Sequence, residues 1–215
     1  MTGAAGTPAT RRRGRPAEAD RRQQILLATQ QLVHEQGWST TSLRDIAARA
    51  GIAPGLLSYY FATKDDLLQA ALADVDERVT RRWTTAMAGI DDPVERVRAG
   101  FQAAVGAFIE DPAMFHLFFD LLAAGRSNPQ LQAAIREVVD NTVNLMAAEI
   151  EQVTDRLGIP LPNSSEVDLA GAVAAAFDGV LLHAAVRDVD PRPAFRALEQ
   201  MVVSLVVDMQ HSHGL

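Results

Sequence analysis

Arginine is the residue type that stands out at the start of the sequence. The segment Arg11-Arg12-Arg13-Gly14-Arg15-Pro16 places four guanidinium groups around one glycine. Arginines of this kind can lie in a narrow DNA minor groove, where the negative potential is strengthened. A non-specific electrostatic anchor, or no role in binding, is the alternative interpretation. Minor-groove contact by Arg11, Arg12, Arg13 and Arg15 is therefore a hypothesis about partner chemistry.

Charge is divided unevenly along the chain. The formal net charge is −7, but residues 1–65 hold nine Lys or Arg against five acidic residues, which gives +4. Residues 66–215 carry −11. Only the first part is suited to approach a polyanion such as double-stranded DNA. A solvated acidic surface with a basic tail would produce the same division.

Catalytic and metal-binding patterns are missing from the sequence. No cysteine is present, which excludes disulfides, thiolate zinc sites and cysteine nucleophiles and fits a reducing cytoplasm. The H-E-x-x-H, G-x-S-x-G, G-x-G-x-x-G and P-loop patterns are absent, as is a Glu-x-x-His pair for a di-iron site. The sequence therefore predicts a protein that is not an enzyme and has no catalytic residues, cofactor or metal.

The elements that would position a binding surface are helices. Apolar residues recur at three-and-four spacing between short Gly, Pro and Asp breaks, and strand alternation is absent. The predicted fold is all-α with about nine helices. Residues 1–19 are expected to be a disordered basic arm, and Asp20 is the expected N-cap of the first helix. The apolar stretch Leu169–Val186 is interpreted as a buried helix of a soluble protein, because Asp178 and His183 within it would be costly in a membrane.

Residues 40–68 have the pattern of a helix-turn-helix. Leu43, Ile46, Ala47 and Ala50 fall at i, i+3, i+4 and i+7, which is one apolar face. Gly51 can adopt the positive φ of a tight turn, and Pro54 suits the first turn of a short helix. Leu57 and Phe61 would point inward, which leaves the other side of this helix free to enter a major groove about 12 Å wide. Thr63 is the expected cap of the next helix.

This segment resembles the signature of the TetR family of transcriptional regulators over roughly residues 21–68. The matching residues are Thr41-Ser42, Asp45-Ile46-Ala47, Ala50-Gly51-Ile52, Gly55, Leu57, Tyr60-Phe61, Lys64 and Leu67-Leu68. Ala53, Leu56 and Ser58 depart from the usual pattern, so base preference is not readable. The Ser-Tyr-Tyr-Phe run and the layout of the second half are similar to the BetI-type subgroup, without naming an effector.

The resemblance implies a DNA-binding unit at residues 20–66 and a larger ligand-binding and dimerisation domain at 67–215. It implies a cytoplasmic, nucleoid-associated homodimeric repressor that a small-molecule effector releases from a palindromic operator. The implied groove-reading residues are Pro54, Gly55, Leu56, Ser58, Tyr59 and Tyr60. Thr41, Ser42 and Arg44 would meet phosphate or a base edge, and Lys64, the only lysine, would meet phosphate. Packing alone is the alternative role for Tyr60.

Five of the eight phenylalanines lie between Phe101 and Phe119, where the resemblance implies a ligand cavity. Small-molecule pockets are mostly apolar with a few placed polar groups, so an apolar or aromatic effector is expected. The candidate walls are Trp83, Met87, Phe101, Phe108, Met114, Phe115, Phe118, Val143, Met146 and Phe177, and the candidate polar groups are His116, Asp120, Asn141 and Asn144. An aromatic stripe at helical spacing is more often part of a filled core than of a pocket.

The last two helices are the expected dimer interface, paired with their copies as a four-helix bundle. The candidate contacts are Ala174, Gly179, Leu198, Met201, Val202 and Leu205. Asp178 and His183 are interpreted as a buried hydrogen-bonded pair across this interface. The rival hypothesis is a DNA-binding or interaction protein without an effector, with an architectural or activator role. A closed, side-chain-filled C-terminal core would favour that rival.

Overall fold

The structure is a computed structural model that describes residues 14–110, 112–126, 128–158, 161 and 164–212. Nine α-helices and no strand occur in these residues, which confirms the predicted all-α fold. The helices are α1 (Gly14–Gln36), α2 (Leu43–Arg49), α3 (Pro54–Tyr60), α4 (Lys64–Met87), α5 (Pro93–Glu110), α6 (Pro112–Gly125), α7 (Pro129–Leu157), α8 (Glu166–Arg187) and α9 (Arg192–Ser212).

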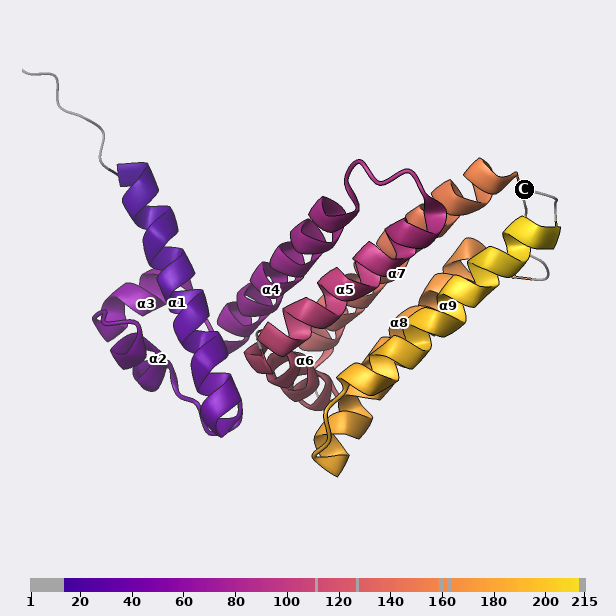
Figure 1. Cartoon of the computed structure of the whole chain (residues 1–215). Helices are drawn as coiled ribbons and strands as arrows, with labels where there is room; N and C mark the ends of the chain where they lie inside the picture. The colour runs from indigo at the N-terminus through magenta and orange to yellow at the C-terminus, as the bar shows by residue number, and fades with distance from the viewer. Residues whose placement is uncertain (1–13, 111, 127, 159–160, 162–163, 213–215) are drawn as a thin grey trace, which may run out of the picture.

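The first three helices form an N-terminal unit at one end of the molecule, and α4 leads from it into an elongated C-terminal bundle of α4–α9 (Figure 1). Ile25, Leu26 and Ile46 are fully buried in the core of the N-terminal unit. That core continues through the first half of α4 to Leu117 and Leu121 of α6. The two parts are therefore joined by shared apolar packing as well as by the chain.

Local signals in the sequence explain where most helices begin and end. Gly51 has a φ of 64°, the left-handed conformation predicted for its turn, and Gly37 has a φ of 79° at the end of α1. Ser42, Thr63 and Ser165 each accept a hydrogen bond from a backbone N–H at the start of α2, α4 and α8. An aspartate three residues later completes a capping box in each case.

The beginning of α1 differs from the prediction. The helix starts at Gly14, so Asp20 lies inside it and is not its N-cap, and residues 14–19 are helical rather than disordered. The sequence Pro16-Ala-Glu-Ala-Asp contains good helix formers, and a proline is compatible with the first turn. A single aspartate therefore does not mark the beginning of α1.

The outermost layer of the C-terminal bundle is the pair α8 and α9 (Figure 1). α8 is the one described helix that is long and apolar enough to cross a membrane by length and composition, and only 22% of its apolar window is buried. The prediction of a buried helix is therefore wrong for the single chain. Twelve large hydrophobic side chains are exposed among the described residues, and half of them lie on or beside these two helices: Val167, Leu182, Val186, Val189, Met201 and Leu205.

Candidate nucleic-acid interface and ligand cavities

The helix α3 has a buried inner side, which packs on the core, and an exposed outer side. Leu57 is 1% exposed and Phe61, directly after the helix, is 5% exposed, so both fasten α3 to the core. Tyr59 is 73% exposed and points away from that core. The predicted residues Pro54, Gly55, Leu56 and Ser58 are exposed as well. A helix of this kind presents one complete face to a partner.

Tyr60 occupies an intermediate position at the end of α3. It is partly buried and packs against the core, and its ring meets Tyr59 edge-to-face with centroids 5.4 Å apart. Packing is thus one of its roles. Part of the side chain remains accessible, and its contact with DNA stays a prediction.

Three predicted DNA contacts lie at or just before the start of α2, and they differ in exposure. Ser42 and Arg44 are exposed at the N-terminal end of α2, as the phosphate-contact hypothesis requires. Thr41 is only 2% exposed. Its hydroxyl donates to the Gly37 carbonyl at 2.8 Å and accepts from the Gln36 side-chain amide at 3.2 Å. The prediction of a DNA contact by the Thr41 side chain is therefore corrected: the hydroxyl holds the α1–α2 turn.

Lys64 is tied to the same turn. Its ammonium donates to the Trp38 carbonyl at 2.7 Å and lies 4.1 Å from the centroid of the Trp38 ring. Burial lowers the pKa of Lys64, while the neighbouring Asp65 acts in the opposite direction. One of three ammonium donors is occupied in this way. The predicted phosphate contact would have to use the remaining two.

The basic arm lies mostly beyond the described residues. Arg11, Arg12 and Arg13 are outside them, and Arg15 is in the first turn of α1 with a side chain that is not described. The minor-groove hypothesis for these arginines stays a prediction.

The C-terminal bundle touches the N-terminal unit through α6 and the turn after it. The Asp120 carboxylate of α6 accepts the backbone N–H of Trp38 at 2.6 Å. The Asn128 amide, just before α7, donates to Asp65 at the start of α4 at 2.7 Å. Asp120 was expected to be a polar group of the ligand cavity, and this is wrong because its carboxylate faces the α1–α2 turn.

Two apolar cavities lie inside the C-terminal bundle. The α6 cavity, of about 150 Å³, is lined by α4, α5, α6, α7 and α8. The α9 cavity, of about 100 Å³, is lined by α4, α5, α7, α8, α9 and Leu161. Both are walled by Trp83, Ala104, Met146 and Phe177. These four side chains therefore stand between two neighbouring spaces.

Most of the predicted wall residues line these cavities. Trp83 and Phe177 line both, Met87 and Phe101 line the α9 cavity, and Phe108 and Phe118 line the α6 cavity. Asn141 and Asn144 are exposed and line neither cavity, so the structure corrects their placement, as it does for Val143. The side chains of Met114, Phe115 and His116 lie outside those described.

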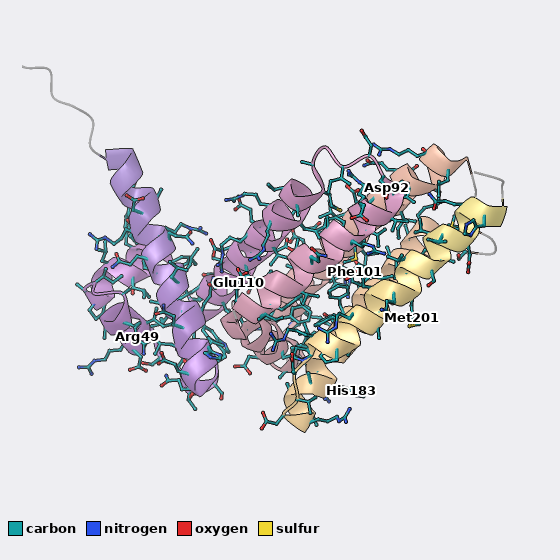
Figure 2. All side chains as sticks on the ribbon, viewed as in Figure 1. Arg49, Asp92, Phe101, Glu110, His183 and Met201 are labelled. Carbon is teal, nitrogen blue, oxygen red and sulfur yellow. The ribbon has the colours of Figure 1, made fainter. Side chains whose placement is uncertain are left out.

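Four charged groups at the cavities were not predicted as ligand contacts, and one of them is Glu149 of α7, which lines the α9 cavity. Asp76 of α4 and Asp178 of α8 line the α6 cavity, and Arg96 of α5 lines the α9 cavity. A signal for Asp76 exists in the sequence, because it stands four residues after Leu72 and seven before Trp83, on one helix face. His183 is exposed on α8 of the single chain (Figure 2), and Asp178 lines the α6 cavity. Their pairing across the dimer interface stays a prediction.

The proposed dimer contacts separate into outward and inward residues. Met201 is 70% exposed, Leu205 is 38% exposed, and a side chain added at Gly179 would meet open space. Figure 2 marks Met201 on α9, in the outer layer of the bundle. Ala174 lines the α6 cavity, Val202 and Leu205 line the α9 cavity, and Leu198 packs against the Phe177–Phe195 cluster. Ala174, Leu198 and Val202 are only partly buried, so their dimer contacts stay predictions.

Known proteins share the sequence pattern and the fold. Residues 25–71 match the family model for bacterial regulatory proteins of the tetR family. The HTH-type transcriptional regulator BetI of Cronobacter sakazakii is 28% identical over 173 residues, which cover 77% of this chain and 79% of that protein. The transcriptional regulator FadR of Bacillus subtilis, solved with stearoyl-CoA, is similar in structure with a TM-score of 0.75 and 17% identity, covering 85% of this chain and 97% of FadR. A transcriptional regulator of Saccharomonospora viridis, solved with choline, has a TM-score of 0.70 and 18% identity, covering 86% and 96% of the two chains.

The buried and exposed sides of α3, together with the capped helices around it, define a helix-turn-helix protein. Residues 25–71 carry the DNA-binding domain of the tetR family, and the relatives that align over most of the chain are HTH-type transcriptional regulators. The C-terminal bundle has the fold of the relatives that were solved with ligands.

Proposed function

We propose that this protein is a cytoplasmic, homodimeric repressor that a small-molecule effector releases from a palindromic operator. The observation that carries the proposal is the two-sided character of α3, in which Tyr59 is exposed while Leu57 and Phe61 are buried. A recognition helix needs this division, because it must be rigid toward its own protein and free toward the major groove. The positive charge of residues 1–65 adds attraction for phosphates.

The outer face of α8 and α9 supports the homodimer. Leu182 and Val186 lie four residues apart on α8, and Met201 and Leu205 have the same spacing on α9, all exposed in the single chain. Two apolar helices from each copy can bury these stripes as a four-helix bundle. A two-fold arrangement would also set two α3 helices about one DNA turn, about 34 Å, apart on inverted half-sites.

The α6 connections supply a route from the cavities to the recognition helix. Phe118 and Phe119 line the α6 cavity, and the next residue, Asp120, holds the backbone of Trp38. Lys64, at the start of α4, holds the carbonyl of the same residue. An effector that displaces α6 would therefore shift Trp38 and the α1–α2 turn relative to α4. A coupling of about 1–3 kcal/mol, typical of allostery, changes DNA affinity roughly 5–150-fold.

The cavities favour an effector-controlled regulator over the rival without an effector. A purely architectural protein needs no cavity, whereas this bundle holds two neighbouring apolar spaces. The similar structures hold ligands as different as stearoyl-CoA and choline. The shared fold therefore does not determine the class of ligand. The ligand class depends on the residues that line the cavities.

In vitro selection from a pool of randomised DNA duplexes tests the proposed function. The full chain should enrich an inverted repeat with half-site centres about one helical turn apart. A promoter that overlaps this selected duplex should then lose transcription when the protein is added. Enrichment of a single, unrepeated site would contradict the dimeric operator, and increased transcription would contradict the repressor role.

A further inference from the structure

The α6 cavity combines an aromatic wall with two carboxylates. Asp76 comes from α4 and Asp178 from α8, so acidic groups of two different helices line one space. The aromatic side chains around them are Trp83, Phe108, Phe118, Phe119 and Phe177. Aromatic faces attract cations through their negative ring potential. Carboxylates within such walls are the complement of a positively charged ligand.

Neither carboxylate has a cationic partner in the described part of the chain. Asp178 has no hydrogen bond or ion pair there, and desolvation raises its pKa to about 6. Asp76 is bonded to the neutral amide of Asn141, lies near the acidic Glu137, and has a pKa that burial raises. Ionised carboxylates in an apolar space are unfavourable unless they are paired. A cation that enters this cavity would therefore form ion pairs with two carboxylates that have no cationic partner in the described part of the chain.

An anionic ligand finds no comparable group. Arg96 is the one Lys or Arg among the described residues that line either cavity. Its guanidinium is already bound to Glu149 at 2.7 Å and to the carbonyls of Met87 and Ile90 at 2.9 and 3.2 Å. Releasing Arg96 for a carboxylate or phosphate would leave the half-buried Glu149 unpaired. The cavities therefore disfavour fatty acids and acyl thioesters with a phosphate-bearing head.

We propose that the effector is an organic cation with an apolar body: its ammonium group pairs with Asp76 and Asp178 in the α6 cavity, and its hydrocarbon part extends past Trp83 and Phe177 toward the α9 cavity. This inference rests on the proposed function, because it names the ligand class of that same effector site. A cavity of about 150 Å³ holds a benzene-sized group. The head must consequently be compact, and additional length has to enter the neighbouring space.

Position along the chain links this site to DNA binding. Asp76 lies on α4, the helix whose first residue, Lys64, holds Trp38. Asp178 lies on α8, whose outer side is the proposed dimer face. A cation that draws Asp76 and Asp178 toward one point would therefore act on α4 and α8 together, the two helices that set the spacing of paired α3 helices.

Three probes of equal length separate charge from hydrophobicity: hexan-1-aminium, hexan-1-ol and hexanoate, titrated into the full-length protein by isothermal calorimetry at pH 7.5. Hexan-1-aminium should bind about 10-fold or more tightly than hexan-1-ol, because charge-assisted hydrogen bonds are the stronger kind. Hexanoate should bind most weakly. Equal or tighter binding of the alcohol or of hexanoate, or no measurable binding of hexan-1-aminium, would overturn the inference.

Two variants locate the charge preference. Asp178→Asn and Asp76→Asn should each reduce the preference for hexan-1-aminium over hexan-1-ol at least severalfold, because they weaken binding of the cation more than binding of the alcohol. Glu77→Gln is the matched control, since Glu77 is exposed, adjacent to Asp76 and paired with Arg81. A preference that survives in both Asn variants would remove the assignment to this cavity. DNA selection by the wild-type protein would remain intact in that case, so the two proposals fail separately.

Discussion

The N-terminal unit and the C-terminal bundle of this protein are packed to different degrees. In the N-terminal unit Ile25, Leu26 and Ile46 are fully buried, and the Arg49 guanidinium joins α2 to α1 through both oxygens of Glu35. The C-terminal bundle contains two cavities and an outer layer with half of the exposed large hydrophobic residues. The N-terminal unit is therefore closely packed in the single chain, whereas the C-terminal bundle keeps unfilled volume and exposed apolar surface.

The difference indicates how the two tasks are divided. A closely packed unit holds its surface helix in one geometry, which reading a DNA groove requires. A bundle with unfilled volume gains contacts when a ligand enters, so its conformation can respond to that ligand. The exposed stripes of α8 and α9 leave a second incomplete surface, which a copy of the chain would cover. The predictions below test this contrast.

The largest expected effect is on the incomplete outer surface. Met201→Asp would place a charge in the proposed dimer face, where burial without a partner is costly. The protein should become monomeric in sedimentation-velocity experiments. Affinity for the selected inverted repeat should fall about 100-fold or more, because paired half-sites are no longer bound together.

Ala148→Asp is the control for this change, since Ala148 is exposed on α7 and is not part of the proposed dimer face. It should leave the dimer and the DNA affinity unchanged. A Met201→Asp protein that remains dimeric would show that another surface pairs the copies.

A smaller effect is expected where the two parts meet. Asp120→Asn replaces a charged acceptor of the Trp38 N–H, and hydrogen bonds to charged groups contribute about 1.5–3 kcal/mol. The free energy of unfolding in urea should therefore fall by about 1–2 kcal/mol, and amide exchange should accelerate at residues 37–41. Exchange that is faster throughout the bundle but unchanged at these residues would argue against Asp120 as the connection.

The smallest effect concerns the pH dependence of stability. The folded-state pKa of Asp178 is raised to about 6, above its ordinary value of 3.8. The folded state therefore carries a poorly solvated charge above pH 6, and this cost disappears as the pH falls through 6 toward 4. Asp178→Asn should raise the melting temperature by about 2–4 °C at pH 8. This increase in melting temperature should become smaller as the pH falls toward 4.5.

Asp140→Asn, an exposed change on α7, is the comparison for this pH series. It should shift the melting temperature little and equally at both pH values. A gain for Asp178→Asn that is the same at pH 4.5 and pH 8 would mean that its carboxyl is not desolvated.

Local signals made much of the fold predictable from the sequence. Gly51, Thr63 and Ser165 are residues whose own conformations or side chains end and begin helices, so their roles need no tertiary information. The exposed and buried sides of α3 followed from the spacing of Leu57 and Phe61 in the same way.

The remaining features depend on how helices rotate against one another. Asp120 faces Trp38 rather than a cavity because α6 packs on the end of α1, which no periodicity within α6 could indicate. Val202 and Met201 are both apolar neighbours on α9, yet one faces the cavity and the other faces outward. Apolar character alone could not separate an inward side chain from one on a dimer face.

Binding of the selected DNA duplex by Tyr59→Ala, measured by fluorescence anisotropy beside wild type, tests the central claim most directly. Tyr59 is exposed on α3, so its removal should leave the melting temperature unchanged and lower specific affinity about 10-fold or more, at about 1–3 kcal/mol per recognition contact. Affinity for an unrelated duplex should change little, because phosphate contacts dominate it. Unchanged specific affinity in a stable Tyr59→Ala protein would contradict the assignment of α3 as the groove-reading helix.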